Sequence, residues 1–196
     1  QYDNKTLQID TGPDFRQQVN QYGIKDIEAV IYTHSHADHI NGIDELRYLN
    51  AFERDTMPIY ATQDTMDELT RRFDYMFRES SDGLYKQVVQ PHIITADMFD
   101  RLIQIQNCPI TMTVQDHGRM TSIGFKIGNV GYSTDVSALS ETALATLSGV
   151  ETWIVDCGQY GSDFVYAHPN LYVVMEWNKR VGAKRVILTH LTPRAD

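Results

Sequence analysis

Short apolar runs alternate with helical stretches along the whole chain, and this alternation restricts the fold more than any other feature. The runs 27–32 and 185–188 are short and rich in β-branched residues, which is typical of buried strands. The predicted strands are residues 7–10, 27–33, 58–61, 88–94, 110–114, 122–127, 130–133, 152–155 and 185–189. The predicted helices are residues 13–21, 38–49, 64–77, 140–147 and 171–181. Elements in this mixed order predict an α/β fold in which helices cover the faces of sheets.

The size and composition fit one globular domain that covers residues 1–196. Of the 196 residues, 42% are hydrophobic and 22% are charged. No apolar run approaches the ~20 residues that cross a bilayer, so no membrane partner is expected. The chain begins at Gln1 close to a predicted strand and stops soon after the last one. We therefore expect further segments at both ends.

Charge and cysteine content indicate which classes of partner and which cellular location to expect. The chain has 17 basic and 26 acidic residues, a net charge of −9. Proteins that bind nucleic acid backbones usually display basic surfaces, so nucleic acid is not an expected partner, although bound metal ions would add local positive charge. Cys108 and Cys157 are the two cysteines and form no Cys-x-x-Cys pair. No disulfide framework organises the fold, and a reducing cytoplasm is the expected location.

The segment richest in potential metal ligands is the run His34-Ser35-His36-Ala37-Asp38-His39, between a predicted strand and a predicted helix. Imidazole nitrogens and a carboxylate form a donor set suited to zinc, manganese or iron. His34 and His36 lie on the same side of an extended loop, whereas Asp38 and His39 diverge, so one loop can supply two ions. Surface histidines without a role are the alternative, which the density of the pattern disfavours. The start of the next helix also favours an anion such as phosphate.

Three more candidates stand at the ends of predicted strands. These are His117, Asp135 and His190. Strand ends that open into a shared crevice are where α/β proteins assemble sites. Taken singly, each of the three is more often a structural residue, and the residues alone leave that alternative open.

The order His34-x-His36-x-Asp38-His39, followed by His117, Asp135 and His190, resembles the ligand set of the metallo-β-lactamase superfamily. A narrower similarity, to the PhnP-type phosphodiesterases, rests on residues 10–16 (DTGPDFR), 43–47 (IDELR) and 131–135 (GYSTD), and on His168 upstream of 189–191 (THL). The resemblance covers nearly the whole chain. It implies a four-layer αββα sandwich of the metallo-β-lactamase type that lacks terminal segments here.

The resemblance also implies two divalent metal ions, zinc or manganese, with iron as a further option. One ion would be held by His34, His36 and His117, and the other by Asp38, His39 and His190, with Asp135 bridging both.

The resemblance gives roles to two further side chains, His168 and Asp10. His168 would be an active-site histidine that is not a ligand, and it and Asp38 are the predicted catalytic residues. Asp10 would support a ligand histidine. His92 is left without a role and is interpreted as structural. Cys157 follows a predicted strand end, and its expected role is packing in the core. Tyr160 and Tyr166 lie in the loop before His168, where contact with the substrate is an option.

The implied activity is hydrolysis of small phosphodiesters, cyclic ones included, by a metal-bridging hydroxide. His168 would protonate the leaving alkoxide or hold the phosphoryl group. One alternative is a hydrolase of the same superfamily that acts on a thioester, a lactam or an RNA end, since fold alone does not fix function. Another is an accessory protein that binds a metal or a small molecule without catalysis. Relatives with this scaffold often dimerise, so a homodimer is also expected.

Overall fold

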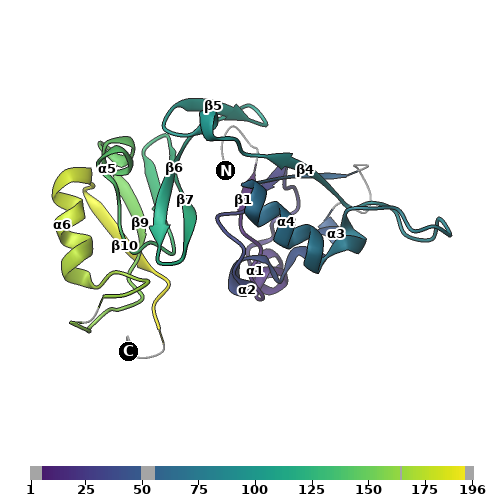
Figure 1. The fold of residues 1–196 in the computed structure, drawn as a ribbon, viewed down its shortest axis with the longest axis horizontal. Coiled ribbons are helices and arrows are strands. Elements are labelled where there is room, and N and C mark those ends of the chain that lie inside the picture. The colour runs from purple at the N-terminus through teal and green to yellow at the C-terminus, as the bar shows by residue number, and fades with distance from the viewer. Residues whose placement is uncertain (1–5, 50–55, 164, 193–196) are drawn as a thin grey trace. The chain divides into compact units, whose positions relative to one another are not determined.

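The structure is a computed structural model that describes residues 6–49, 56–163 and 165–192. Contacts divide the chain into two compact units, Gln1–Ala96 (unit 1) and Asp97–Asp196 (unit 2). Each unit contains one β-sheet with helices packed against it (Figure 1). The prediction of a mixed α/β fold is confirmed. The prediction that residues 1–196 form a single domain stays a prediction.

Unit 1 is built on a parallel sheet in the order β1-β2-β3-β4. Its strands are β1 (Leu7–Ile9), β2 (Ala29–Ile31), β3 (Met57–Ala61) and β4 (Val89–Ile93). Its helices are α1 (Phe15–Tyr22), α2 (Ala37–Ile40), η1 (Ile43–Glu45), α3 (Leu46–Leu49), α4 (Gln63–Arg72) and η2 (Asp74–Met76). Side chains from strands and helices, such as Val30, Ile59, Phe15, Leu46 and Leu69, share one buried core. Because β1 and β2 run parallel in register, the loops that follow them leave the same edge of the sheet.

The predicted helix 38–49 is wrong as a single element, because it is interrupted after Ile40. The carbonyl of His39 accepts a hydrogen bond from the Thr11 backbone N–H (2.8 Å), and the Gly42 N–H donates to the Thr11 carbonyl (2.7 Å). A Cβ on Gly42 would lie 2.3 Å from the carbonyl oxygen of Gly12. The loop after β1 therefore takes the place of the next helical turn. The helix predicted to reach residue 77 also ends early, at Arg72.

Unit 2 is built on a mixed sheet in the order β10-β9-β8-β7-β6-β5. Its strands are β5 (Leu102–Ile105), β6 (Cys108–His117), β7 (Met120–Ile127), β8 (Val130–Ser133), β9 (Thr152–Asp156) and β10 (Arg185–Thr189). Helices α5 (Glu141–Leu147) and α6 (Leu171–Val181) lie on one face of this sheet (Figure 1), and η3 (Ala96–Met98) lies at the boundary of the units. Buried side chains of both helices pack on Trp153 and Val155 of β9. Because β8, β9 and β10 are parallel, they end at the same edge of the sheet.

Most helices and strands of unit 2 lie where the sequence predicts them, but the edge strand β5 does not appear among the predictions. The predicted hairpin at 127–130 is confirmed by the antiparallel pairing of β7 with β8, and α6 and β10 have the predicted bounds. Strand β5 was not predicted and β6 is longer than predicted, because β5 exposes the apolar Leu102 and β6 continues into the polar residues 115–117. Among the residues that the structure describes, no helix has the length and apolar character to cross a membrane.

Candidate metal centre

The ligand candidates of unit 1 lie on the loop that joins β2 to α2. His34 and His39 are buried, whereas His36 and Asp38 are exposed. The ring of His34 lies 4.6 Å from the ring of His36 and 4.2 Å from that of His39, measured between centroids. The loop therefore brings three imidazoles together, with His39 as near to His34 as His36 is.

Asp10, at the end of β1, holds this loop in place. One carboxylate oxygen accepts the backbone N–H of Thr33 (2.7 Å). The other accepts the Thr33 hydroxyl (2.7 Å) and lies 2.7 Å from Nδ1 of His39. Since the hydroxyl hydrogen of Thr33 points to Asp10, its oxygen accepts from Nδ1 of His34, 3.0 Å away. The predicted supporting role of Asp10 thus extends to two histidines.

These contacts decide which nitrogen each ring has available for a metal. An Nδ1–H that donates to a fixed acceptor leaves Nε2 as the nitrogen with a lone pair, which is the usual arrangement of histidines that bind metals. His34 and His39 both have this arrangement. The chemistry of the donor set in unit 1 therefore fits a divalent ion.

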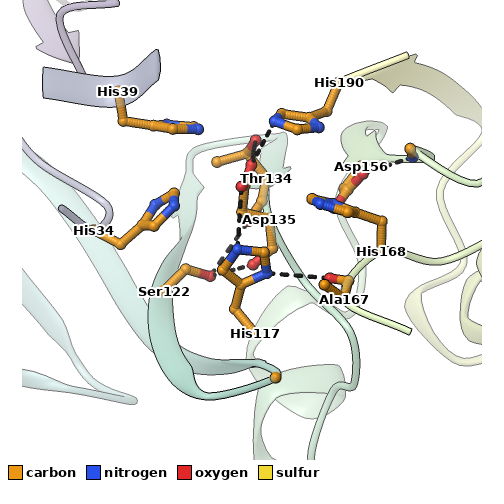
Figure 2. A network of polar contacts seen from close by, with 12 residues as sticks. His34, His39, His117, Ser122, Thr134, Asp135, Asp156, Ala167, His168 and His190 are labelled. Atoms are coloured by element: carbon orange, nitrogen blue, oxygen red, sulfur yellow. Dashed lines mark hydrogen bonds and ion pairs between the residues drawn. The ribbon is translucent and has the colours of Figure 1, made fainter. Parts of the chain in front are cut away.

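In unit 2, Asp135 lies between two histidines (Figure 2). One of its carboxylate oxygens is 3.3 Å from Nε2 of His117, and the other is 3.2 Å from Nε2 of His190. His117 and Asp135 are almost fully buried, whereas about a quarter of the His190 side chain is exposed (27%). His117 directs its Nδ1 to the carbonyl of Ala167 (3.1 Å), so its Nε2 is available as a ligand. The three strand ends thus meet around one carboxylate.

Three of these residues have an unusual backbone conformation. Asp10, Asp135 and His190 have φ angles of 56°, 48° and 56°, in the left-handed region that few residues other than glycine adopt. Each one follows a strand, and the left-handed turn redirects its side chain. Around Asp135, the Ser122 hydroxyl donates to the Asp135 carbonyl (2.8 Å) and the Thr134 hydroxyl donates to the Asp135 carboxylate (2.9 Å). Strained conformations that are held this way concentrate at functional sites.

His168, in the loop before α6, is fixed by a carboxylate that the sequence reasoning missed. Asp156 is fully buried at the end of β9, and its carboxylate accepts Nδ1–H of His168 (2.7 Å). The same carboxylate accepts the backbone N–H groups of Gly158 (2.8 Å) and Val136 (3.1 Å). The His168 ring stacks on His190 (4.7 Å between centroids). The signal that identifies Asp156 is its position, because it ends a strand as His117 does.

Gly158 provides the space for this ring. A Cβ there would lie 2.9 Å from Cγ of His168 and 3.3 Å from a carboxylate oxygen of Asp156. Both distances are too short for an undisturbed side chain. His168 therefore packs directly on the backbone of the turn that also donates to Asp156.

The remaining candidates lie outside this cluster. His92 on β4 stacks on Tyr60 (4.8 Å), in line with its structural interpretation. Cys157 is buried in the core of unit 2, and burial raises the pKa of its thiol to about 11, with the charge of Asp156 adding to the effect. Tyr160 and Tyr166 are exposed on the loop that carries His168.

Comparison with protein-family models identifies the family of the chain. Residues 5–191 match the family model described as a beta-lactamase superfamily domain. The chain belongs to this superfamily. A metallo-β-lactamase fold and histidine–aspartate clusters point together to a metal-dependent hydrolase.

Two solved structures agree with the superfamily fold. A crystal structure of a new diphosphatase from the PhnP family is 29% identical and covers 97% of this chain and 70% of that chain, with a TM-score of 0.81. The metallo-β-lactamase fold protein YhfI from Bacillus subtilis is 23% identical and covers 97% of this chain and 76% of that one, with a TM-score of 0.77, which shows the fold alone. The predicted metallo-β-lactamase type of fold and the similarity to PhnP-type members are confirmed.

One curated relative has a different name. The octanoyltransferase of Porphyromonas gingivalis (strain ATCC BAA-308 / W83) is 28% identical over 195 residues, which is 97% of this chain. The chain spans 37% of the length of this relative.

Proposed function

We propose that the chain is a metal-dependent phosphodiesterase that hydrolyses small phosphodiesters in the cytoplasm. Membership of the superfamily supports hydrolysis, and the 29% identical diphosphatase from the PhnP family supports a phosphorus centre as the point of attack. Cys108 and Cys157 are free thiols, which fits a reducing location.

The observation that carries the proposal is the pair formed by Asp156 and His168. Donation from Nδ1 to the buried carboxylate fixes the ring and leaves Nε2 directed away from Asp156. A histidine fixed by a carboxylate is suited to hold a proton at Nε2 and to deliver it to a leaving alkoxide. Its neighbours in unit 2 are the predicted ligands His117 (5.2 Å between centroids) and His190. A histidine at this position is suited to protonate the leaving group of a phosphodiester, which supports the proposal.

The proposed ligands are the seven residues that the family resemblance implies, drawn from both units: His34, His36, Asp38, His39, His117, Asp135 and His190. Two divalent ions, when bound, would activate a water molecule and offset the negative charge that grows on the phosphoryl oxygens. Asp135 would be a metal ligand. Asp10 would keep the ligand loop of unit 1 in place.

The test compares two substrates that differ in the leaving group. Bis(p-nitrophenyl) phosphate releases a stable phenolate, whereas ring opening of adenosine 2′,3′-cyclic phosphate releases a ribose alkoxide, which is a poor leaving group. If His168 acts as the proton donor, His168→Ala lowers turnover about 10²–10⁴-fold for the alkoxide and less for the phenolate, with metal content unchanged. His92→Ala, a histidine in an unrelated stack, serves as the matched control and keeps full activity. Loss of metal in His168→Ala, or absence of turnover on both esters in wild-type protein with bound metal, contradicts the proposal.

A thioester hydrolase is the second candidate, because of the relative named octanoyltransferase. The match covers 97% of this chain and 37% of that protein, whose name refers to an acyl group. The same donor set could hold a metal ion, which would activate water for attack on an acyl carbon. Hydrolysis of an octanoyl thioester such as octanoyl-N-acetylcysteamine, together with inert phosphodiesters, would favour this candidate over the first.

A further inference from the structure

Tyr32 lies directly after β2 in the core of unit 1, and no step of the proposed reaction uses it. The side chains of Tyr32 and Thr11 are both fully buried. Their hydroxyl groups share a hydrogen bond of 2.9 Å, and among the residues that the structure describes neither hydroxyl has another partner. A buried hydroxyl costs free energy unless it is paired. Each of the two side chains therefore fixes the position of the other.

Thr11 also holds helix α2, through its backbone. Its N–H donates to the His39 carbonyl (2.8 Å), and its carbonyl accepts the Gly42 N–H (2.7 Å). Helix α2 has four residues, Ala37–Ile40, whereas an isolated helix needs roughly 12 residues to be stable in water. The position of α2 therefore depends on contacts such as those with Thr11.

Two glycines let the loop after β1 pack directly on the backbone of α2. A Cβ on Gly12 would lie 2.6 Å from the carbonyl oxygen of Asp38, and a Cβ on Gly42 would lie 2.3 Å from that of Gly12. Both distances are shorter than a van der Waals contact. Because no side chain separates the two backbones, a displacement of the loop at Thr11 would pass directly to Asp38 and to the residue after it.

Asp10 restrains a different part of the same region. Its carboxylate accepts the backbone N–H and the hydroxyl of Thr33, and it lies 2.7 Å from Nδ1 of His39. Thr33 in turn lies beside Nδ1 of His34 (3.0 Å). Asp10 therefore orients imidazole rings, whereas Thr11 restrains the backbone that carries Asp38 and His39.

We propose that Tyr32 is a positioning residue which, through Thr11, fixes α2 and so sets the affinity for the metal ion assigned to Asp38 and His39. The proposal rests on the ligand set of the proposed function. The chain of contacts runs from the Tyr32 hydroxyl to the Thr11 side chain, and from the Thr11 backbone to the His39 carbonyl. Because His34 is held through Thr33 instead, the effect should be selective for one of the two ions.

The test is release of zinc from the loaded protein to the chelating dye 4-(2-pyridylazo)resorcinol. Asp38→Asn and His36→Ala identify which step of release belongs to which pair of ligands. Tyr32→Phe should weaken binding about 10-fold in the step that Asp38→Asn changes, and less than about twofold in the other. Tyr60→Phe is the matched control on the neighbouring strand β3, because the ring of Tyr60 stacks on His92. Equal shifts of both steps in Tyr32→Phe, no shift, or the same shift in Tyr60→Phe overturns the proposal.

A double variant separates positioning from packing. Thr11→Val and Tyr32→Phe each leave one buried hydroxyl without its partner, so each should lower the urea midpoint of unfolding. Combined in one chain, they leave no unpaired hydroxyl, and the midpoint should recover toward that of the wild type. The affinity for the ion assigned to Asp38 should nevertheless stay about 10-fold low, as in either single variant. An affinity that follows the midpoint in all three variants would show a packing effect alone and would refute the positioning role.

Thr11→Ser provides the conservative rescue, since it keeps the hydroxyl and both backbone hydrogen bonds. Its metal affinity should equal that of the wild type, and a loss as large as that of Thr11→Val would contradict the proposal. Failure of the proposed function gives a different result. Wild-type protein that holds two ions but cleaves no phosphodiester removes that function and leaves the test of Tyr32 in force. Wild-type protein that binds no ion overturns the ligand set and the role of Tyr32 together.

Discussion

The two units present their candidate ligands in opposite ways. Unit 1 carries its ligands on one short loop, and a single carboxylate, Asp10, holds the loop through Thr33 and His39. Unit 2 collects its ligands from strand ends far apart in the sequence, and they have different supports. His117 contacts the Ala167 carbonyl, and Asp135 accepts the Thr134 hydroxyl. His168, which is not a predicted ligand, contacts Asp156.

The difference predicts different vulnerabilities. A change at the shared support of unit 1 disturbs several ligands together, because three contacts depend on one side chain. A change in unit 2 disturbs one residue and leaves its neighbours in place. One substitution is therefore expected to disturb several ligands where they share a loop, and a single residue where they lie on separate strands.

The largest effect is expected for Asp10→Asn. Asparagine tolerates the left-handed backbone of this position, but its amide has one acceptor oxygen and cannot accept the Thr33 N–H, the Thr33 hydroxyl and Nδ1–H of His39 together. Buried donors left without acceptors cost about 2–3 kcal/mol of unfolding free energy in total. Loss of support for ligand histidines lowers metal affinity about 10–100-fold. Urea unfolding and metal analysis measure the two effects.

Asp14→Asn is the control for that change, since Asp14 is exposed and its side chain makes no capping hydrogen bond. Equal losses in the two variants would show that Asp10 has no special part in holding the loop.

A smaller and more selective effect is expected for Asp156→Asn in unit 2. The variant loses the charged acceptor of His168 Nδ1–H while the side chain keeps its shape. Turnover should fall about 10–100-fold, with the metal content of the wild type retained. Steady-state kinetics with metal analysis on the same sample measure this. A variant that loses metal to the extent seen for Asp10→Asn would remove the contrast between the units.

The same contrast explains what the sequence could predict. The ligand run 34–39 was readable from residue types alone, since its members are contiguous. His117, Asp135 and His190 stood at predicted strand ends, but only the family resemblance linked them. The strand directions that bring the ends of β6, β8 and β10 to one edge of the sheet are not local information. Asp156 was missed because a single carboxylate after an apolar run has no pattern. The break after Ile40 was missed because it arises from Thr11 and Gly12, which are distant in sequence.

A change at Gly158 sharpens the comparison within unit 2. Gly158→Ala would press on the His168 ring, with a Cβ 2.9 Å from its Cγ. We expect turnover to fall several-fold, with KM and metal content little changed, because the ring shifts while the ligands stay. Gly128→Ala is the control: Gly128 has a φ of 54° and no atom near the position of a Cβ, so it tests backbone strain alone. A larger loss of turnover in Gly128→Ala would show that the loss in Gly158→Ala comes from lower stability and not from contact with the His168 ring.

The smallest effect is expected at the cysteines. Burial raises the pKa of the Cys157 thiol to about 11, so almost no thiolate forms near neutral pH. Native protein should therefore react with a thiol reagent such as DTNB only after denaturation, with no loss of turnover before then. Rapid labelling of Cys157 in active protein would show that unit 2 opens around β9.

The most direct measurement is the number of metal ions per chain in full-length protein, compared with one ligand variant from each unit. The account predicts two ions in the wild type, and one or fewer in both His36→Ala of unit 1 and His190→Ala of unit 2. Two ions retained in either variant, or none in wild-type protein supplied with zinc and manganese, would contradict the proposal that the chain binds two metal ions through the predicted ligands.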